Sequence, residues 1–174
     1  MIDLTKVLNS DGKEIHAEEM IGFETFVSRL GEFPITSSTP VSLTIKNKGN
    51  QELQLSGMVT LHVLIPCSRC LEDVDTEFVI EFDKELDMKM DDGERQKALD
   101  EHSYIEGYNL DVDELVYGEI LVNWPVKVLC KEDCKGICSV CGTNLNLSTC
   151  SCETTDLDPR MAKIRDIFSK FKEV

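Results

Sequence analysis

Hydrophobic and polar residues alternate along three successive stretches in the first half of the chain. Over 41–45 and 53–65 the apolar side chains occupy odd positions, and the intervening residues 47–50 form a turn signal. Over 74–82 the even positions face one way, and acidic residues occupy most of the others. A period of two is typical of strands with one buried face. The pattern therefore predicts antiparallel strands, the second of them long, with a bend or bulge at Gly57.

Two helices are predicted later in the chain. The first covers 111–123, with Asp111 as its N-cap and apolar residues at helical spacing behind it. It ends before Pro125, because proline disfavours a helical conformation in the residue that precedes it. The second begins at Asp158-Pro159, where an N-cap residue is followed by proline in the first turn. Its apolar stripe either packs on the chain's own core or binds a partner.

The chain contains eight cysteines, six of them within 130–152. Closely spaced cysteine pairs are the usual way to supply the four thiolates of a tetrahedral zinc site. The spacing predicts one local set of four, made of Cys138, Cys141, Cys150 and Cys152. The other four are assigned to a second, long-range set, made of Cys67, Cys70, Cys130 and Cys134. We therefore expect two zinc ions with four cysteine ligands each, while exchanges of ligands between the sets, such as Cys134 for Cys138, stay open.

Local sequence around the cysteines favours metal-binding knuckles. Cys67 and Cys70 follow the long strand and fall at the tip of a predicted hairpin. Gly142 follows Cys141, and its freedom to adopt positive φ lets backbone N–H groups turn toward the thiolates. Four-cysteine sites leave no coordination position for water or substrate, which favours a structural role. The sequence has no phosphate-binding glycine loop, nucleophile elbow or deaminase pattern, so we expect no enzyme and no small-molecule substrate.

The whole pattern predicts an α+β fold: an antiparallel β-sheet or partly open barrel with a few helices and a carboxy-terminal zinc-knuckle segment. Residues 21–36 add one or two strands, and the charged, aperiodic stretch 87–102 is expected to be a loop or a short exposed helix. We expect a β-rich core domain over 1–126 and a cysteine-rich zinc-binding segment with the final helix over 127–174.

A disulfide framework is the alternative interpretation of eight cysteines. The first residues carry charge, and no apolar stretch of signal-peptide length follows them. The chain also lacks a run of about 18 apolar residues, so no membrane span is expected. These features predict a cytoplasmic protein, and in a reducing compartment such cysteines more often bind metal. Free or redox-active thiols are the third possibility.

The net charge of −15 is concentrated in one part of the chain. Residues 71–119 hold 18 acidic and four basic residues, a balance of −14, whereas 157–174 has a balance of +2. So acidic a surface repels phosphate backbones and attracts basic surfaces. Its candidate partner-binding residues, close to the hairpin tip, are Glu72, Asp73, Asp75 and Glu77. The alternative is an acidic stretch that only maintains solubility.

The sequence resembles the YceD family, the large ribosomal RNA subunit accumulation proteins of bacteria and plastids. The matching segments span most of the chain: Cys67-Ser-Arg-Cys70-Leu71-Glu72, Leu110-Asp111-Val112, Trp124-Pro125, Cys130, Lys135-Gly136-Ile137-Cys138, Cys141-Gly142-Thr143-Asn144-Leu145-Asn146 and Asp158-Pro159-Arg160-Met161. Two positions depart from the family pattern, with Ser139 where proline is common and Trp124 where leucine is common. Some members lack the carboxy-terminal cysteines, so zinc is not expected to perform the task that the family shares.

The resemblance implies a role in the synthesis, processing or stability of large-subunit ribosomal RNA, without known enzymatic activity. Because the chain is strongly acidic, a basic ribosomal protein or assembly factor is the expected partner, with an indirect effect on the RNA. Two other functions stay open. One is a zinc–thiol redox switch or chaperone-like protein, and the other is direct RNA binding through the zinc knuckle and the final helix.

Overall fold

The computed structural model describes residues 1–89 and 104–152. The chain divides into two compact units. The first comprises Met1–Cys67 and Glu72–Val128, and the second comprises Ser68–Leu71 and the chain from Leu129 onward. The helix predicted to begin at Asp158 lies outside the described residues, as does most of the stretch 87–102.

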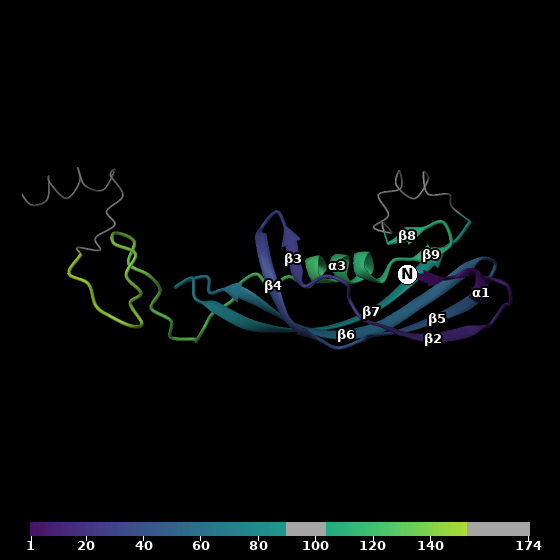
Figure 1. Cartoon of the computed structure of the whole chain (residues 1–174), viewed down its shortest axis with the longest axis horizontal. Helices are drawn as coiled ribbons and strands as arrows, with labels where there is room; N and C mark the ends of the chain where they lie inside the picture. The colour runs from purple at the N-terminus through teal and green to yellow at the C-terminus, as the bar shows by residue number, and fades with distance from the viewer. Residues whose placement is uncertain (90–103, 153–174) are drawn as a thin grey trace, which may run out of the picture. The chain divides into compact units, whose positions relative to one another are not determined.

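An antiparallel sheet forms the body of the first unit (Figure 1). Its strands are β2 (Glu14–Glu19), β3 (Thr25–Ser28), β4 (Gly31–Ser38), β5 (Val41–Gly49), β6 (Glu52–Pro66) and β7 (Asp73–Asp87). The order is β2-β5-β6-β4-β3, and β7 pairs with β6 along its whole length. Within the described residues β7 has one strand neighbour and the sheet does not close into a barrel. The antiparallel sheet predicted from the sequence is confirmed, and 21–36 contributes two strands.

Side-chain alternation decides which face of the sheet is buried. The odd-numbered apolar residues of β5 and β6 and the even-numbered Phe78, Ile80 and Phe82 of β7 are all buried. Of the bend or bulge expected at Gly57, the bulge is absent, since the pairing of Gly57 with Leu43 and Phe82 continues without a shift of register. A Cβ at Gly57 would lie 2.5 Å from the carbonyl oxygen of Ser42 and 2.6 Å from the ring of Phe82. The glycine is therefore needed for close packing.

Short elements that the alternation did not predict complete the first unit. They are β1 (Ile2–Asp3), α1 (Thr5–Leu8), β8 (Ile105–Glu106) and β9 (Asn109–Leu110), with the three strands in a sheet of order β1-β9-β8. The buried amide of Asn47 joins α1 to β5. Its nitrogen donates to the carbonyl oxygens of Val7 and Ser10 at 3.1 Å, and its oxygen accepts from the N–H of Gly49 at 2.8 Å. Asn47 thus ties carbonyl oxygens at and just after the end of α1 to β5 through one buried side chain.

The helix α3 (Val112–Val122) packs on the sheet (Figure 1), and its predicted N-cap is confirmed. The carboxylate of Asp111 accepts hydrogen bonds from the N–H groups of Asp113 at 2.9 Å and Glu114 at 3.2 Å. Just after the helix, the indole of Trp124 stacks on Phe26 at 5.1 Å between ring centroids and contacts Phe33 at 4.7 Å. Trp124 therefore joins the end of α3 to β3 and β4.

Candidate functional sites

The carboxy-terminal set of cysteines is Cys138, Cys141, Cys150 and Cys152, and their four sulfur atoms lie within 4.8 Å of one another. The first pair belongs to a tight turn. The N–H of Gly142 donates to the carbonyl oxygen of Cys138, and the N–H of Cys138 donates to that of Thr143, each at 2.8 Å. Gly142 has a φ of 73°, the left-handed conformation predicted for it.

The hairpin set is Cys67, Cys70, Cys130 and Cys134, whose sulfurs also lie within 4.8 Å of one another. The sulfurs of Cys70 and Cys130 are 3.5 Å apart. A hydrogen bond of 2.8 Å from the N–H of Cys67 to the carbonyl oxygen of Glu72 closes the turn. Leu71, which follows Cys70 as Gly142 follows Cys141, has a φ of 63° and is exposed. A left-handed conformation is costly for leucine, so this turn is strained.

The geometry of both sets fits a tetrahedral metal ion. With a zinc–sulfur bond of about 2.3 Å, tetrahedral ligands lie roughly 3.8 Å apart. All eight cysteines are among the described residues, and no disulfide joins any two of them. Four soft sulfur ligands without histidine suit zinc, copper(I) or iron. The described cysteines thus form two groups that could hold metal ions, and they are the local set predicted from spacing and the set assigned from the four remaining cysteines.

Hydrogen bonds make the thiols of the carboxy-terminal set unequal. The side chain and then the backbone of Thr143 lower the pKa of Cys141 to about 6, and the Thr143 hydroxyl lies 3.1 Å from its sulfur. The pKa of Cys152 is raised to about 12, first by its hydrogen bond with Cys141 and then by burial. Metal ligands must be deprotonated, so a metal that binds here displaces protons from the other thiols.

Polar contacts hold the second unit together around Arg69, which lies between the first two cysteines. The guanidinium of Arg69 donates to the carbonyl oxygen of Cys134 at 2.8 Å, and its own carbonyl oxygen accepts from the N–H of Ile137 at 3.1 Å. A Cβ at Gly136, which has a φ of 79°, would lie 3.0 Å from that same oxygen. Arg69 therefore holds the hairpin tip against 134–137 through both side chain and backbone.

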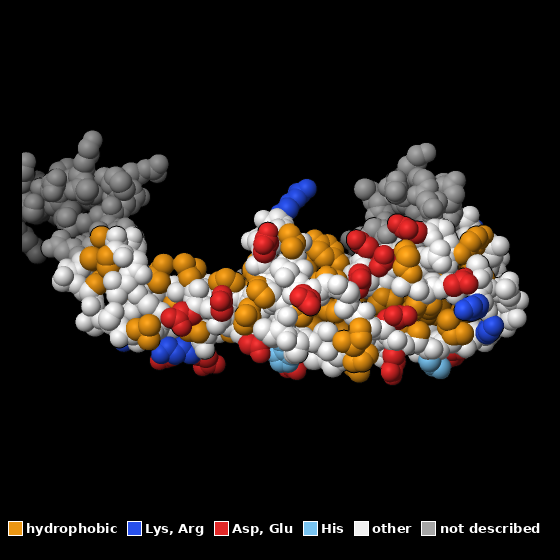
Figure 2. All heavy atoms as spheres, in the orientation of Figure 1, with side chains coloured by type: hydrophobic (Ala, Val, Ile, Leu, Met, Phe, Trp, Pro, Cys, Tyr) orange, Lys and Arg blue, Asp and Glu red, His pale blue; other side chains and the backbone are white. Residues whose placement is uncertain are grey.

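The acidic residues proposed to bind a partner lie on the first unit. Glu72 precedes β7, and Asp73, Asp75 and Glu77 occupy outward positions of this strand, where all four are exposed. The outward row continues with Glu81, Asp83, Glu85 and Asp87. Acidic side chains outnumber basic ones on the face that Figure 2 shows. The β7 row thus presents negative charge on one strand, with local partners at Lys48 for Glu85 and at His62 for Asp75.

Comparison with known proteins decides the family. The chain matches the model of YceD, the large ribosomal RNA subunit accumulation protein, over residues 55–168. It belongs to the YceD family. A protein of Mycobacterium leprae (strain TN), described as uncharacterized, is 21% identical over 158 residues, which cover 90% of this chain and 69% of that protein. No solved structure matches the chain.

The YceD match begins within β6 and includes β7, α3 and all eight cysteines. The family's description associates this chain with accumulation of large-subunit ribosomal RNA and names no enzymatic reaction. Among the described residues, no helix is long and apolar enough to cross a membrane.

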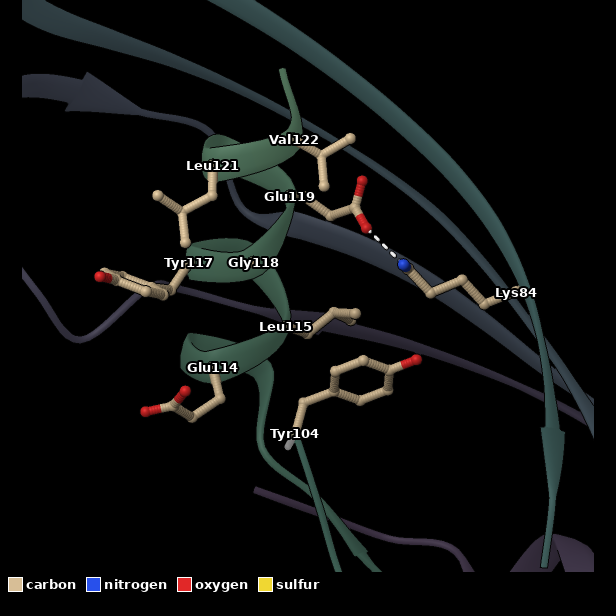
Figure 3. A pocket seen from close by; sticks show the side chains of 9 residues that line it. All are labelled: Lys84, Tyr104, Glu114, Leu115, Tyr117, Gly118, Glu119, Leu121 and Val122. Carbon is tan, nitrogen blue, oxygen red and sulfur yellow. Dashed lines mark ion pairs between the residues drawn. The ribbon is translucent and has the colours of Figure 1, made fainter. Parts of the chain in front are cut away.

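A cavity of about 300 Å³ in the first unit was not predicted from the sequence (Figure 3). Leu115, Leu121 and Val122 of α3 supply apolar walls, and the ring of Tyr104 also lines it. Inside, the ammonium of Lys84 and a carboxylate oxygen of Glu119 are 2.7 Å apart. Lys84 also lies 5.8 Å from the centroid of the Tyr104 ring. This YceD-family protein therefore carries a largely buried ion pair between β7 and α3.

A sequence signal for this ion pair exists. Lys84 interrupts the buried even positions of β7 between Phe82 and Leu86, and Glu119 falls on the apolar stripe of α3 next to Ile120. A charged residue at each of two inward positions indicates a buried pair, since isolated charges are rarely buried.

Proposed function

We propose that this protein is a non-enzymatic factor of ribosome biogenesis that supports the synthesis, processing or stability of large-subunit ribosomal RNA. The observation that carries the proposal is the family match over 55–168, which includes the whole acidic row of β7 and both cysteine sets. The partner is a basic ribosomal protein or assembly factor, and the effect on the RNA is indirect.

Both cysteine sets bind zinc in this proposal, and the zinc is structural. Support comes from eight sulfurs gathered in two groups of four, a donor set that leaves tetrahedral zinc no position for water or substrate. Zinc would stabilise the second unit, whose described part contains few buried apolar side chains besides its cysteines. In this role the zinc sites stabilise the fold of the second unit and take no part in a chemical step.

The preference for a basic partner follows from charge. Four outward acidic residues lie near the hairpin tip, at Glu72, Asp73, Asp75 and Glu77, within a stretch that carries −14 of the net −15. A zinc ion with four thiolates adds a formal charge of about −2 at each site. Such a surface repels an RNA backbone and speeds association with a basic protein.

Depletion of the protein tests the cellular role. The ratio of large to small ribosomal subunits in sucrose gradients is expected to fall, with precursors of large-subunit RNA accumulating. Affinity purification, with RNase-treated and high-salt samples in parallel, tests the partner. A basic protein that stays bound after RNase and is lost at high salt supports the proposal. Association that requires RNA in every condition favours direct RNA binding, and an unchanged subunit ratio contradicts the cellular role.

A further inference from the structure

The side chain of Asn146 joins the two cysteine sets. Its position in sequence is between Cys141 and Cys150, inside the loop of the carboxy-terminal set. Its amide nitrogen nevertheless donates to the sulfur of Cys134, a member of the hairpin set, at 3.3 Å. The amide oxygen accepts from the N–H of Lys135 at 2.8 Å, which fixes the nitrogen on the side of the sulfur.

Several hydrogen bonds hold Asn146 in this orientation. The carboxamide oxygen of Asn144 accepts from both the backbone N–H and the side-chain nitrogen of Asn146, each at 2.9 Å. The N–H of Leu145 donates to the carbonyl oxygen of Gly136 at 2.9 Å, and Ile137 forms a β-bridge with Asn144. The loop therefore runs alongside 134–138 before it returns to Cys150.

The loop depends on the carboxy-terminal set for its closure, because Cys141 precedes it and Cys150 follows it. A metal bound by this set fixes both ends of the loop. With both ends fixed, the loop loses less conformational entropy when the side chain of Asn146 contacts Cys134. A donor hydrogen-bonded to a ligand sulfur fixes the position of that sulfur, and partners of this kind commonly strengthen metal binding.

We propose that Asn146 is a positioning residue through which metal binding at the carboxy-terminal set strengthens metal binding at the hairpin set. The inference rests on the proposed function in one respect, namely that both sets bind zinc. Because linkage is reciprocal, zinc at the hairpin set strengthens binding at the carboxy-terminal set by the same factor. The second unit then acquires its two ions cooperatively.

Zinc affinities of the full-length reduced protein, measured by competition with a chromogenic chelator, test the inference. The double variant C141S/C152S isolates the hairpin set, and C67S/C70S isolates the carboxy-terminal set. The coupling factor is a ratio of two zinc affinities of the hairpin set. The first is measured when the carboxy-terminal set is intact, and it is divided by the second, which is measured in C141S/C152S. We expect a factor of roughly 10 to 100, the usual effect of a residue that supports a metal ligand.

Asn146→Ala is expected to bring the coupling factor close to one while the carboxy-terminal set, measured alone, keeps its affinity. Asn146→Ser, which retains a donor, is expected to recover part of the coupling. Leu147→Ala is the matched control, since Leu147 is the next residue of the loop and is 78% exposed. Far-UV circular dichroism verifies that each variant keeps its sheet.

Each outcome decides between the proposals. Two zinc ions per chain with a coupling factor near one in the unsubstituted protein overturn the inference and leave the proposed zinc sites intact. Coupling that survives Asn146→Ala, or that Leu147→Ala abolishes equally, also overturns it. Failure of both sets to bind zinc overturns the proposed zinc sites and the inference together.

Discussion

The ammonium of Lys84 lies 2.7 Å from a carboxylate oxygen of Glu119, although 35 positions separate them in sequence. Lys84 projects from an inward position of β7, and Glu119 belongs to the buried face of α3 (Figure 3). Their side chains are 25% and 9% exposed. Each charge is therefore removed from much of its hydration and is compensated by the other, which makes the pair sensitive to the loss of one member.

Lys84→Met is expected to lower the free energy of unfolding by up to roughly 3 kcal/mol, because Glu119 is then buried without its counter-charge. The double variant Lys84→Met/Glu119→Leu is expected to recover most of the loss, since two apolar side chains can replace a buried pair at little cost. Urea unfolding followed by circular dichroism measures both effects. Equal destabilisation by the single and double variants would contradict this account.

Elemental analysis of the protein purified under reducing conditions is expected to give close to two zinc ions per chain. The physical reason is the presence of two sets of four sulfurs, each with ligands within reach of one ion. Acid is expected to release the metal, because protons compete with it for each thiolate. A zinc content near zero with eight free thiols, or a native mass that shows four disulfides, contradicts the prediction.

Cys138→Ser is expected to loosen residues 130–152, most of all around the carboxy-terminal set, while the sheet of the first unit stays folded. The apolar faces of the strands pack on one another and on α3, and among the described residues this core includes none from 130–152. Cys70→Ser is expected to loosen the hairpin tip in the same selective way. Amide hydrogen exchange, with far-UV circular dichroism as control, separates local from global loss. Cooperative unfolding of the whole chain by either substitution contradicts this prediction.

Leu71→Gly is expected to stabilise the hairpin set. Leu71 holds a φ of 63°, a conformation that costs leucine about 1 kcal/mol and that glycine adopts freely. The gain is expected as tighter zinc binding at the hairpin set, by roughly fivefold for about 1 kcal/mol. Val140→Gly, at another exposed apolar position next to a cysteine, serves as the control. A weaker hairpin site in Leu71→Gly shows that its exposed side chain, not its backbone, matters for that site.

Reversal of Glu72, Asp73, Asp75 and Glu77 to lysine is expected to weaken binding of the basic partner and slow its association, with the sheet still folded. Reversal of Glu14, Glu18, Glu19 and Glu24, which are exposed elsewhere on the first unit, makes the same change in net charge and serves as the control. Association rates by surface plasmon resonance at several salt concentrations compare the two. Equal losses of binding in both variants indicate that net charge alone drives binding. A different result would move the interface to the final segment: binding survives the charge reversal and raised salt, but is lost when Phe168 and Phe171 are replaced.

Local pattern determined much of this protein. Alternation alone predicted the buried faces of β5, β6 and β7. Residues two apart in a strand lie on the same face, so a strand with one buried face shows apolar residues at every second position. Asp111 predicted the start of α3, since an N-cap acts on backbone groups within three residues. Cysteine spacing predicted the carboxy-terminal set and left the other four cysteines for the hairpin set, and Gly142 took the positive φ expected from its place after Cys141. The strand pattern and the N-cap depend on residues near one another in sequence, and the metal sites depend on cysteine, a residue type that is easily recognised as a metal ligand.

Only the tertiary structure decided how distant residues meet. The sequence predicted a bend or bulge at Gly57. The structure shows that Gly57 gives space to Phe82, because the register of β6 and β7 brings that ring onto its backbone. Periodicity places one charge at an inward position of β7 and another on the buried face of α3, but only the packing of α3 on β7 decides that Lys84 pairs with Glu119. Asn146 reaches the sulfur of Cys134 because the loop folds back along 134–138. Such contacts follow from register and packing across the fold, which no local periodicity encodes.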